Sequence, residues 1–474
     1  MTSVLIRHCM GIATGLGGTA ARHPGPDIRI QDGVITALGT LSALPGERTI
    51  DAQDSVVYPA WVNTHHHLFQ SLLKSEPQGQ NQALTQWLAA TPYRFRAAFD
   101  EDIFRVAVRV GLVELALSGC GTVADHNYLY FPGQRFDPSH ILFEEAAALG
   151  MRFVLCRGGA TLTRQLEAEL PQALRPESIE AYWRDVERLV SRHHQPQRDA
   201  MQRVVMAPTT PTFSMRPEEM RDSAALARAL GIRLHSHLSE TVSYQDYAHE
   251  NHRLSPVALA QSLNWLGDDV WFAHLVKLDA EEIALLGQTG TGIAHCPQSN
   301  GRLGSGIAPI AELQRAGVPI SIGVDGAASN EAADMISEVH CAWLMSRARA
   351  GEHSVAQFRG GQGERDIALV DALDVLRWGT AGGAAILGLP ATGTIEVGQC
   401  ADLALYDLSR DPRYFGHLDP LISPIVSGGS ARLRSLLVGG RELVRDGQLA
   451  GVDMKLLHAQ AGQAVERIKS QVQL

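Results

Sequence analysis

The sequence predicts an α/β fold in which a closed, TIM-like (β/α)8 barrel carries a small β-sandwich domain formed from both chain ends. Two observations support this expectation. Through the middle of the chain, short apolar runs alternate about eight times with longer helical stretches, which is typical of a parallel sheet closed into a barrel. Short strands with glycine turns occur at both ends instead, and these distant segments can pair into one domain. We expect a small domain from 1–57 and 386–451, a barrel from 58–385 and a C-terminal helix from 452–474.

The N-terminal segment is expected to form short strands and turns. Its clearest feature is Asp32-Gly33, a good two-residue hairpin turn between the apolar runs 28–30 and 34–38. The same texture returns near the C-terminus, where strands are expected at 393–398, 401–406 and 436–441. Together these two groups of strands supply the small β-domain.

Eight apolar runs are expected to form the barrel strands, in the order 56–62, 122–126, 152–156, 204–207, 233–237, 270–274, 292–295 and 319–325. Helical stretches precede four of them, at 103–117, 141–149, 179–192 and 218–230. The tail, 454–474, has the amphipathic pattern of a helix. In a barrel of this kind, chemistry takes place at the C-terminal ends of the strands.

Composition and charge exclude several classes of protein. The chain has 474 residues, 45% hydrophobic and 19% charged, as in a globular protein with a large core. Its net charge of −10 argues against a nucleic-acid-binding surface. No apolar run is long enough to span a bilayer, and Arg7 and His8 interrupt the only short N-terminal one. The six scattered cysteines form no C-x-x-C pair and are expected to be reduced. We therefore expect a cytoplasmic protein without a nucleic acid or membrane partner.

Polar residues gather where the expected strands end. Hydrogen-bonded loop residues would explain a few of them, but hardly the whole set. The sequence therefore places candidate functional residues at one end of the barrel, and these residues are His65, His67, Asp125, His126, Arg157, Thr209, His237, His274, His295 and Asp325.

The triplet His65-His66-His67 follows the first barrel strand and is the centre of this group. Side chains alternate in a strand, so His65 and His67 point the same way and His66 points the other way. His66 should therefore tolerate substitution better than either neighbour. Two imidazoles at one strand end are half of a metal site, provided that other strand ends supply the remaining ligands.

Later strand ends offer those ligands. Of the two histidines in His235-Ser236-His237, His237 lies nearer the strand end, and Glu240 follows it in the next loop. Asp325 offers a carboxylate oxygen. Three imidazoles and one carboxylate suit zinc, which lowers the pKa of a bound water to roughly 7.

Five motifs are spread along the chain: NTHHHLFQ (63–70), SGCGTVADH (118–126), HLSET (237–241), HCPQSN (295–300) and GVDGAASN (323–330). Together they resemble the amidohydrolase superfamily, within its cytosine/guanine deaminase and triazine hydrolase branch, and as a set they are highly specific. A small β-domain made from both termini is also the arrangement of that family. The resemblance implies a metal-dependent hydrolase barrel.

The resemblance also implies roles for individual residues. One metal ion, usually zinc, with another divalent ion such as iron as the alternative, would be bound by His65, His67, His237 and Asp325. Glu240 would be the catalytic proton shuttle, His274 would orient the attacking water, and Asp325 would take up its proton. Some relatives bridge two metals with a carboxylated lysine on the fourth strand, but 204–209 contains no lysine, which favours a single metal. Relatives are commonly homodimers or larger, so a homo-oligomer is expected.

The implied reaction is hydrolysis of a carbon–nitrogen bond in a cyclic amidine, with release of ammonia. The deaminase type with a His/Cys/Cys zinc site is excluded because no P-C-x-x-C motif occurs. Adenosine-type relatives tend to carry a histidine where Thr209 stands, which favours a free heterocycle over a nucleoside. The expected substrate is an oxo-substituted pterin, isoxanthopterin first. Guanine or 8-oxoguanine is the alternative, and an s-triazine is third.

Five residues are candidate substrate contacts. In the family, a glutamine at the position of Gln70 hydrogen-bonds the ring, and a tryptophan placed like Trp87 lines the pocket, with core packing as the alternative for Trp87. Arg157 is expected to pair with an acidic lactam oxygen, and a structural salt bridge is its alternative. Tyr130, with packing as its alternative, and Ser329 complete the set.

A non-catalytic protein is the remote alternative, because some superfamily members have lost their ligands and serve as structural or regulatory proteins. Here all four ligands, the acid and the second histidine are present. An enzyme is therefore expected.

Overall fold

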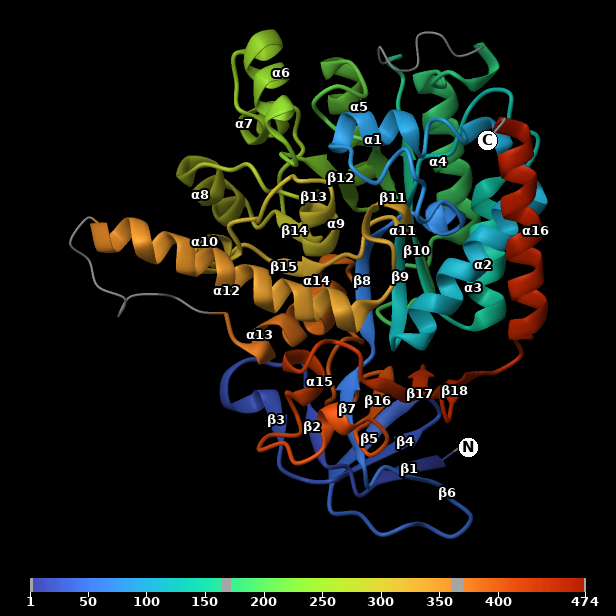
Figure 1. Ribbon diagram of the computed structural model, residues 1–474, viewed down its shortest axis with the longest axis vertical. Helices are drawn as coiled ribbons and strands as arrows, with labels where there is room; N and C mark the ends of the chain where they lie inside the picture. The colour runs from blue at the N-terminus through green and yellow to red at the C-terminus, as the bar shows by residue number, and fades with distance from the viewer. Residues whose placement is uncertain (1–2, 164–171, 360–369, 473–474) are drawn as a thin grey trace.

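Eight parallel strands close into a barrel at the centre of the molecule, as the sequence predicted (Figure 1). The computed structural model describes residues 3–163, 172–359 and 370–472. Neighbouring strands follow the order β10-β11-β12-β13-β14-β15-β8-β9, and pairing of β15 with β8 links the last strand to the first. The strands are β8 (Trp61–His66), β9 (Cys120–Asn127), β10 (Arg152–Gly159), β11 (Gln202–Pro208), β12 (Leu234–Leu238), β13 (Val270–His274), β14 (Gly292–His295) and β15 (Ile320–Ile322).

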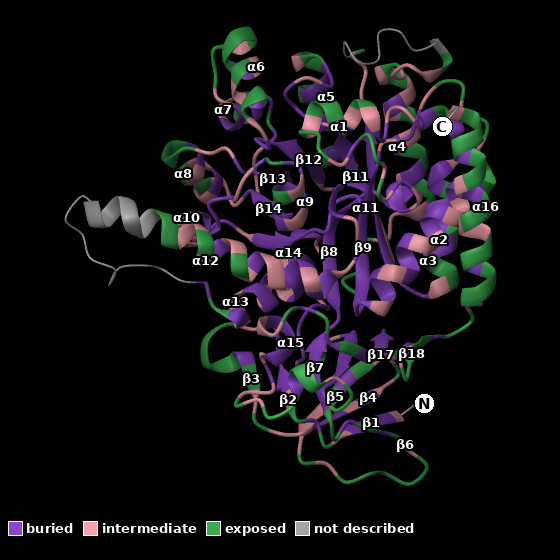
Figure 2. Cartoon of the chain, viewed as in Figure 1, coloured by how far each residue is buried: buried purple, intermediate pink, exposed green. Residues whose placement is uncertain are grey.

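The barrel strands are buried on both faces. Apart from the first two residues of β11, every residue of these strands is buried, and Figure 2 shows them as the continuous purple centre of the molecule. Helices cover the outer face and side chains fill the interior, so the strands are apolar runs rather than alternating ones. The polar exceptions lie at the C-terminal ends.

Helices between the strands cover the outside of the barrel, including the four that the sequence predicted. Capping residues determine where they begin and end. The side chain of Asp137 accepts a hydrogen bond from the backbone N–H of His140 at the start of α3, and Gly150 ends that helix at φ 83°. The covering helices are α2 (Glu101–Leu117), α3 (Pro138–Leu149), α4 (Ile179–His193), α5 (Pro217–Ala229), α6 (Val242–His252), α7 (Pro256–Ser262), α8 (Ala280–Thr289), α10 (Ile310–Arg315) and α12 (Met335–Arg359).

Both chain ends build a smaller unit of two sheets beside the barrel, where blue and red strands mix in Figure 1. Strand β7 (Ser55–Pro59) from the N-terminal part pairs with β16 (Leu403–Asp407) from the C-terminal part. Apolar side chains from both ends, among them Ile6, Val57 and Leu403, form one core cluster. The other strands are β1 (Ser3–Arg7), β2 (Gly11–Ala13), β3 (Arg22–His23), β4 (Asp27–Gln31), β5 (Val34–Gly39), β6 (Arg48–Asp51), β17 (Arg432–Val438), β18 (Arg441–Arg445) and β19 (Gln448–Leu449).

The predicted small β-domain from both ends is thus confirmed, and so is the hairpin turn, since Asp32 and Gly33 have φ of 48° and 84° between β4 and β5. The division into 1–57 with 386–451, 58–385 and 452–474 as separate domains stays a prediction.

Three of the expected strands differ in the structure, either because no strand forms or because the strand ends elsewhere. Residues 393–398 form turns and bends instead of a strand, because Gly393 and Gly398 have φ of 80° and 94°. The run 436–441 is interrupted at Gly439-Gly440, where both φ angles are positive, so it forms the end of β17, a turn and the start of β18. Strand β15 stops at Ile322 rather than at residue 325, and the chain then turns through Asp325 at φ 60°.

The C-terminal tail forms the expected helix, α16 (Met454–Val472), which packs against α2. Arg467 of α16 contacts the carboxylate of Asp100, the N-cap residue of α2. Within the described ranges, no helix is both long and apolar enough to cross a bilayer.

Candidate metal and active site

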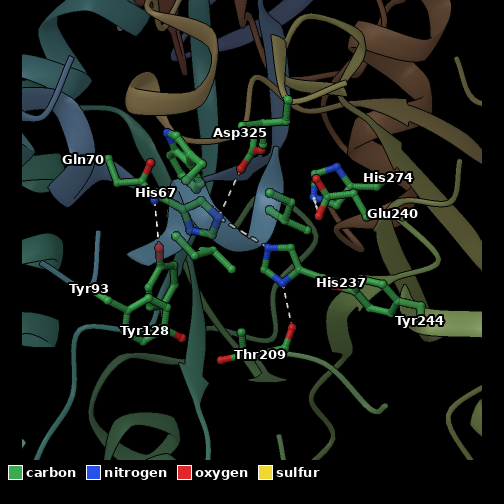
Figure 3. Close-up of a pocket in the computed structure, with 14 residues that line it drawn as sticks. His67, Gln70, Tyr93, Tyr128, Thr209, His237, Glu240, Tyr244, His274 and Asp325 are labelled. Carbon is green, nitrogen blue, oxygen red and sulfur yellow. Dashed lines mark hydrogen bonds and ion pairs between the residues drawn. The ribbon is translucent and has the colours of Figure 1, made fainter. Parts of the chain in front are cut away.

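A cavity of about 490 Å³ opens at the C-terminal ends of the barrel strands (Figure 3). Strands from opposite sides of the ring contribute to it because all eight run in the same direction. Histidines and carboxylates, tyrosines and apolar side chains make up its wall, which consists of His67, Gln70, Leu84, Trp87, Leu88, Tyr93, Tyr128, Thr209, His237, Glu240, Tyr244, His274, Leu303 and Asp325.

The structure brings the four predicted metal ligands together. Asp325 Oδ1 lies 3.4 Å from His65 Nε2 and 3.1 Å from His67 Nε2. His237 Nε2 lies 3.4 Å from His67 Nε2. Three triads each place their ligand atoms within 4.8 Å of one another, namely His65–His67–Asp325, His65–His237–His274 and His67–His126–His237. One cation at the centre of this group would contact ligands from β8, β12 and the loop after β15.

Hydrogen bonds behind the imidazoles orient them for a metal. The Nδ1 of His67 donates to the carbonyl of His126 at 2.7 Å, and the Nδ1 of His237 donates to that of Thr209 at 2.7 Å. Since carbonyls only accept, the Nε2 atom of each ring carries a lone pair when the ring is neutral. The Nε2 of His65 is buried and has no hydrogen-bond partner among the described residues. Lone pairs and a carboxylate facing one another in a buried site need a cation, so the residues present fit a metal ion.

Asp325 is held in place from several sides. Its backbone N–H donates to the carbonyl of His65 at 3.0 Å, and its Oδ2 lies 2.6 Å from Ser299 Oγ and 3.2 Å from Ser329 Oγ. Burial acts to raise the pKa of Asp325, but the imidazoles of His65 and His67 that face its carboxylate hold it well below the ordinary value. The carboxylate is therefore ionised and ready to bind a cation.

His66 points away from the ligand group, as the alternation of the strand predicted, but it is not a free surface residue. Its ring is fully buried, and its Nδ1 lies 2.5 Å from the backbone carbonyl of Asp325. The sequence suggested that His66 would tolerate substitution better than His65 or His67. That comparison stays a prediction, although loss of this ring would remove its contact with the backbone carbonyl of Asp325.

Glu240 and His274 are neighbours in the cavity wall, with Glu240 Oε2 3.7 Å from His274 Nε2 (Figure 3). Ser305 Oγ donates to Glu240 Oε1 at 3.2 Å, and the Nδ1 of His274 donates to Asn300 Oδ1 at 2.9 Å. Burial raises the pKa of Glu240 above its ordinary value. A carboxyl group with a raised pKa beside a metal site suits the predicted role of a proton shuttle.

Gln70 and Trp87 line the cavity, as predicted for substrate contacts. Gln70 Nε2 donates to Tyr128 Oη at 2.9 Å, and its buried Oε1 has no partner among the described residues. Trp87 lies on α1 (Leu84–Ala90), and its indole N–H donates to the carbonyl of Ala328 at 3.2 Å. The cavity wall therefore combines an amide side chain with an aromatic ring.

Six wall residues were neither predicted contacts nor strand-end candidates, namely Leu84, Leu88, Tyr93, Tyr128, Tyr244 and Leu303. Tyr93 lies in the loop run that contains Trp87, and Tyr128 directly follows a strand end, so position gave a weak signal for these two. Tyr244 lies on α6 and Leu303 follows α9 (Pro297–Arg302), and neither has a local pattern that distinguishes it from a packing residue.

Arg157 and Tyr130 are not in the cavity wall, which revises their assignment as substrate contacts. The buried Arg157 guanidinium lies 2.6 Å from a carboxylate oxygen of Glu177 and 2.8 Å from one of Asp185. It also lies 3.6 Å from the ring centroid of Tyr130, whose hydroxyl bonds to that of Ser139. With two carboxylates and an aromatic face as partners, Arg157 has the structural role that was its alternative.

Ser329 is also absent from the cavity wall. Its hydroxyl is directed at Asp325 Oδ2 and lies 2.9 Å from Ser299 Oγ. The hydroxyl therefore contacts a predicted metal ligand rather than the cavity, and its assignment as a substrate contact is revised as well.

Asp125 and His126, at the end of β9, contact the segment that carries the predicted ligand His67. Asp125 Oδ1 accepts the backbone N–H of Leu68 at 2.6 Å, which holds the turn that follows His67. The Nε2 of His126 donates to the carbonyl of Ala207 at 2.9 Å. Burial raises the pKa of Asp125 to about 7.

Comparisons with known proteins agree with this geometry. The sequence model of the amidohydrolase family matches residues 56–443. An isoxanthopterin deaminase from an unknown prokaryotic organism is 60% identical over 473 residues, which cover 99% of this chain and 98% of that protein. An 8-oxoguanine deaminase from Pseudomonas aeruginosa is 39% identical over 465 residues and covers 97% of each chain.

Solved structures share the fold over the whole chain. The crystal structure of an amidohydrolase from an environmental sample of the Sargasso Sea is 53% identical, with a TM-score of 0.86 and full coverage of both chains. The structure of atrazine chlorohydrolase from Arthrobacter aurescens TC1 complexed with zinc is 28% identical, with a TM-score of 0.87. That match covers 98% of this chain and 100% of the other.

Proposed function

Because the chain belongs to the amidohydrolase family, we propose that it is a metal-dependent hydrolytic deaminase that removes the 2-amino group of isoxanthopterin, or of a related oxo-substituted pterin, as ammonia. The observation that carries this proposal is the convergence of His65, His67, His237 and Asp325 beside Glu240 in one cavity. The 60% identity to an isoxanthopterin deaminase supports the pterin as substrate.

We propose that the site holds one zinc ion, with another divalent ion such as iron as the alternative. Three imidazoles and one carboxylate are a usual zinc set, and the related atrazine chlorohydrolase was crystallised with zinc. A metal bound here supplies a water whose pKa is lowered towards neutrality. No lysine stands on β11 to bridge a second ion, which supports a single metal.

The side chains then divide the proton transfers between them. Asp325 accepts a proton from the attacking water, and Ser299 and Ser329 hold the orientation of its carboxylate. Glu240 delivers a proton to the ring nitrogen beside the amino-bearing carbon, so that negative charge does not build up on the ring. His274, fixed by its bond to Asn300, orients the water for attack. Ammonia leaves with the proton held by Asp325.

The cavity wall supports recognition of a flat, oxo-substituted amino-heterocycle. Trp87 and Tyr128 offer aromatic surface, and the side-chain amide of Gln70 offers a hydrogen-bonding group for the ring. Thr209, where a histidine would be expected for a nucleoside, closes the wall on the β11 side.

A purine is the second candidate, because an 8-oxoguanine deaminase is 39% identical over 97% of this chain and guanine has the same aminolactam edge as a pterin. An s-triazine is third, and a non-catalytic protein is the remote alternative. The test is ammonia release from isoxanthopterin, pterin-6-carboxylate, guanine, 8-oxoguanine and melamine. Turnover of isoxanthopterin above the others is expected. Turnover of only the purines would reject the pterin and keep the deaminase.

Substitution of Gly326 by alanine is expected to weaken substrate recognition without loss of metal. Gly326 has an ordinary φ of −71°, but a Cβ there would lie 1.9 Å from Gln70 Oε1, so the amide must move. The ratio kcat/KM should fall roughly tenfold, the value of one lost hydrogen bond, mainly through KM. Steady-state kinetics together with metal analysis of the same sample would measure this effect.

Two further variants control the Gly326 experiment. Gln70→Leu should reproduce the loss, because it removes the same side-chain amide. Gly301→Ala should be neutral, because a Cβ at Gly301 meets nothing within 4 Å. Unchanged kinetics in both Gly326→Ala and Gln70→Leu would exclude Gln70 from substrate binding.

A homo-oligomeric state and a cytoplasmic location stay predictions. The six cysteines are free, and five of them are buried, which agrees with a reducing compartment.

A further inference from the structure

His235 is a fully buried histidine that the proposed mechanism does not use. It lies on β12 two residues before His237, so both side chains point into the barrel and His235 lies one layer deeper. Its Nε2 lies 2.8 Å from the Nδ1 of His65, and its Nδ1 lies 2.9 Å from the carbonyl oxygen of Trp271. The ring also stacks on the Trp271 indole, at 4.5 Å between centroids and 18° between planes.

These two contacts determine where the hydrogens lie. A carbonyl oxygen only accepts, so Nδ1 of His235 carries a hydrogen. The buried ring contacts no carboxylate through its nitrogens, and an unpaired buried charge is costly, so the ring is neutral. Its Nε2 therefore has a lone pair and accepts the Nδ1–H of His65. The remaining lone pair of His65 is then on Nε2, which is the atom that faces Asp325 Oδ1 at 3.4 Å.

The three imidazole ligands differ in one respect. His67 and His237 donate to backbone carbonyls, which no substitution removes. His65 donates to a side chain instead. If His235 could not accept this bond, His65 could place its hydrogen on Nε2, and that tautomer cannot bind a cation through Nε2.

Trp271 completes this support. Its indole N–H donates to the carbonyl of Thr64 at 3.1 Å, in the residue directly before His65. Trp271 thus holds both the backbone before the ligand and, through its own carbonyl and ring, the histidine behind it. The whole chain of contacts is buried, so water does not substitute for any member.

We propose that His235 is a positioning residue that selects the metal-binding tautomer of His65 and thereby determines the metal affinity of the site. This inference rests on the proposed function, because it takes His65 as a metal ligand. Groups behind metal-bound histidines typically alter metal affinity by about 10–100-fold.

Two substitutions at His235 separate the effect of losing the hydrogen-bond acceptor from the effect of changing the shape of the ring. His235→Phe keeps a flat ring but removes the acceptor, and zinc affinity should fall about 10–100-fold. His235→Gln restores an acceptor oxygen near the position of Nε2, so its affinity should return to within a few-fold of the unsubstituted chain. The measurement is competition between a chelator and the metal-stripped, full-length protein, with Zn²⁺ alone as ligand.

His295→Phe is the matched control. His295 is also a buried histidine at a strand end, but neither of its ring nitrogens has a hydrogen-bond partner in the described part of the chain. It tests the effect of replacing a buried imidazole without removing a bond to a ligand, so zinc affinity should be unchanged.

Nitrogen NMR of histidine-labelled, metal-free protein gives a second readout that does not depend on activity. The unsubstituted chain should show the hydrogen of His65 on Nδ1, and His235→Phe should show both tautomers. If His235→Phe does not fold, the tautomer of His65 in the unsubstituted chain still tests the proposal. A hydrogen on Nε2 of His65 in that chain overturns it. Unchanged zinc affinity in His235→Phe, or an equal loss in the Phe and Gln variants, also overturns it.

Failure of the proposed function would look different. A chain that binds zinc with the expected dependence on residue 235, but releases no ammonia from any tested heterocycle, would reject the deaminase and keep the role of His235. A chain that binds no zinc would reject both.

Discussion

Replacing Glu240 with glutamine is expected to leave the metal site loaded and to reduce turnover by roughly 10²–10⁴-fold, the usual contribution of a general acid–base group. Glu240 lies in the cavity wall 3.7 Å from His274, but it is not a member of any of the three ligand triads. Glutamine keeps the size of the side chain and loses the proton that it would deliver. Single-turnover rates and zinc content of the same preparation would measure the two effects separately.

Ser305→Ala is the matched control for Glu240→Gln. It removes the hydroxyl that donates to Glu240 Oε1 but leaves the carboxyl group in place. Its turnover should fall far less than that of Glu240→Gln. Near-normal turnover in Glu240→Gln would remove this residue from the mechanism, and loss of zinc in that variant would indicate a structural role instead.

Replacing Asp325 with asparagine should have the largest effect of all, because one side chain is assigned two tasks. Asparagine keeps a hydrogen-bonding group for Ser299 and Ser329, but it loses the negative charge that faces His65 and His67. Both zinc affinity and turnover should fall, and turnover by more than roughly 10⁴-fold, since ligand and proton acceptor are lost together. Chelator competition and ammonia release would measure the two losses.

Ser329→Ala distinguishes the revised role of Ser329 from the role that the sequence suggested. A residue that only orients Asp325 should lower kcat modestly and leave KM unchanged. If Ser329 contacts the substrate, its loss should raise KM.

Full activity in Asp325→Asn after addition of zinc would contradict the proton-acceptor role of Asp325, whatever the result for Ser329.

The sequence by itself predicted the barrel and the residues that reach its mouth, and both follow from local patterns. The roles proposed for the metal ligands, Glu240 and His274 came from the resemblance to the amidohydrolases. Alternation of apolar runs with helical stretches predicts a parallel barrel, and the position of His65, His67, His237 and Asp325 at strand ends follows from it. Because every strand end of such a barrel lies at the same mouth, residues far apart in sequence were correctly expected to meet.

Other features were decided only by the tertiary structure. A strand-end arginine has the same sequence pattern whether its partner is a substrate or a carboxylate, and only the fold places Glu177 and Asp185 beside Arg157. Likewise, Ser329 was recognised by its motif, but the direction of its hydroxyl depends on the turn at Asp325.

His235 shows the same limit within the metal site. The sequence places it one layer below His237, where its pattern does not distinguish it from a packing residue. The role that we propose for it depends on its contact with His65, from the opposite side of the barrel. Local patterns indicate which residues reach the barrel mouth. Which of these residues touch one another across the mouth depends on side-chain packing between distant strands. Each contact needs two strands, and the sequence of neither strand specifies where the other lies.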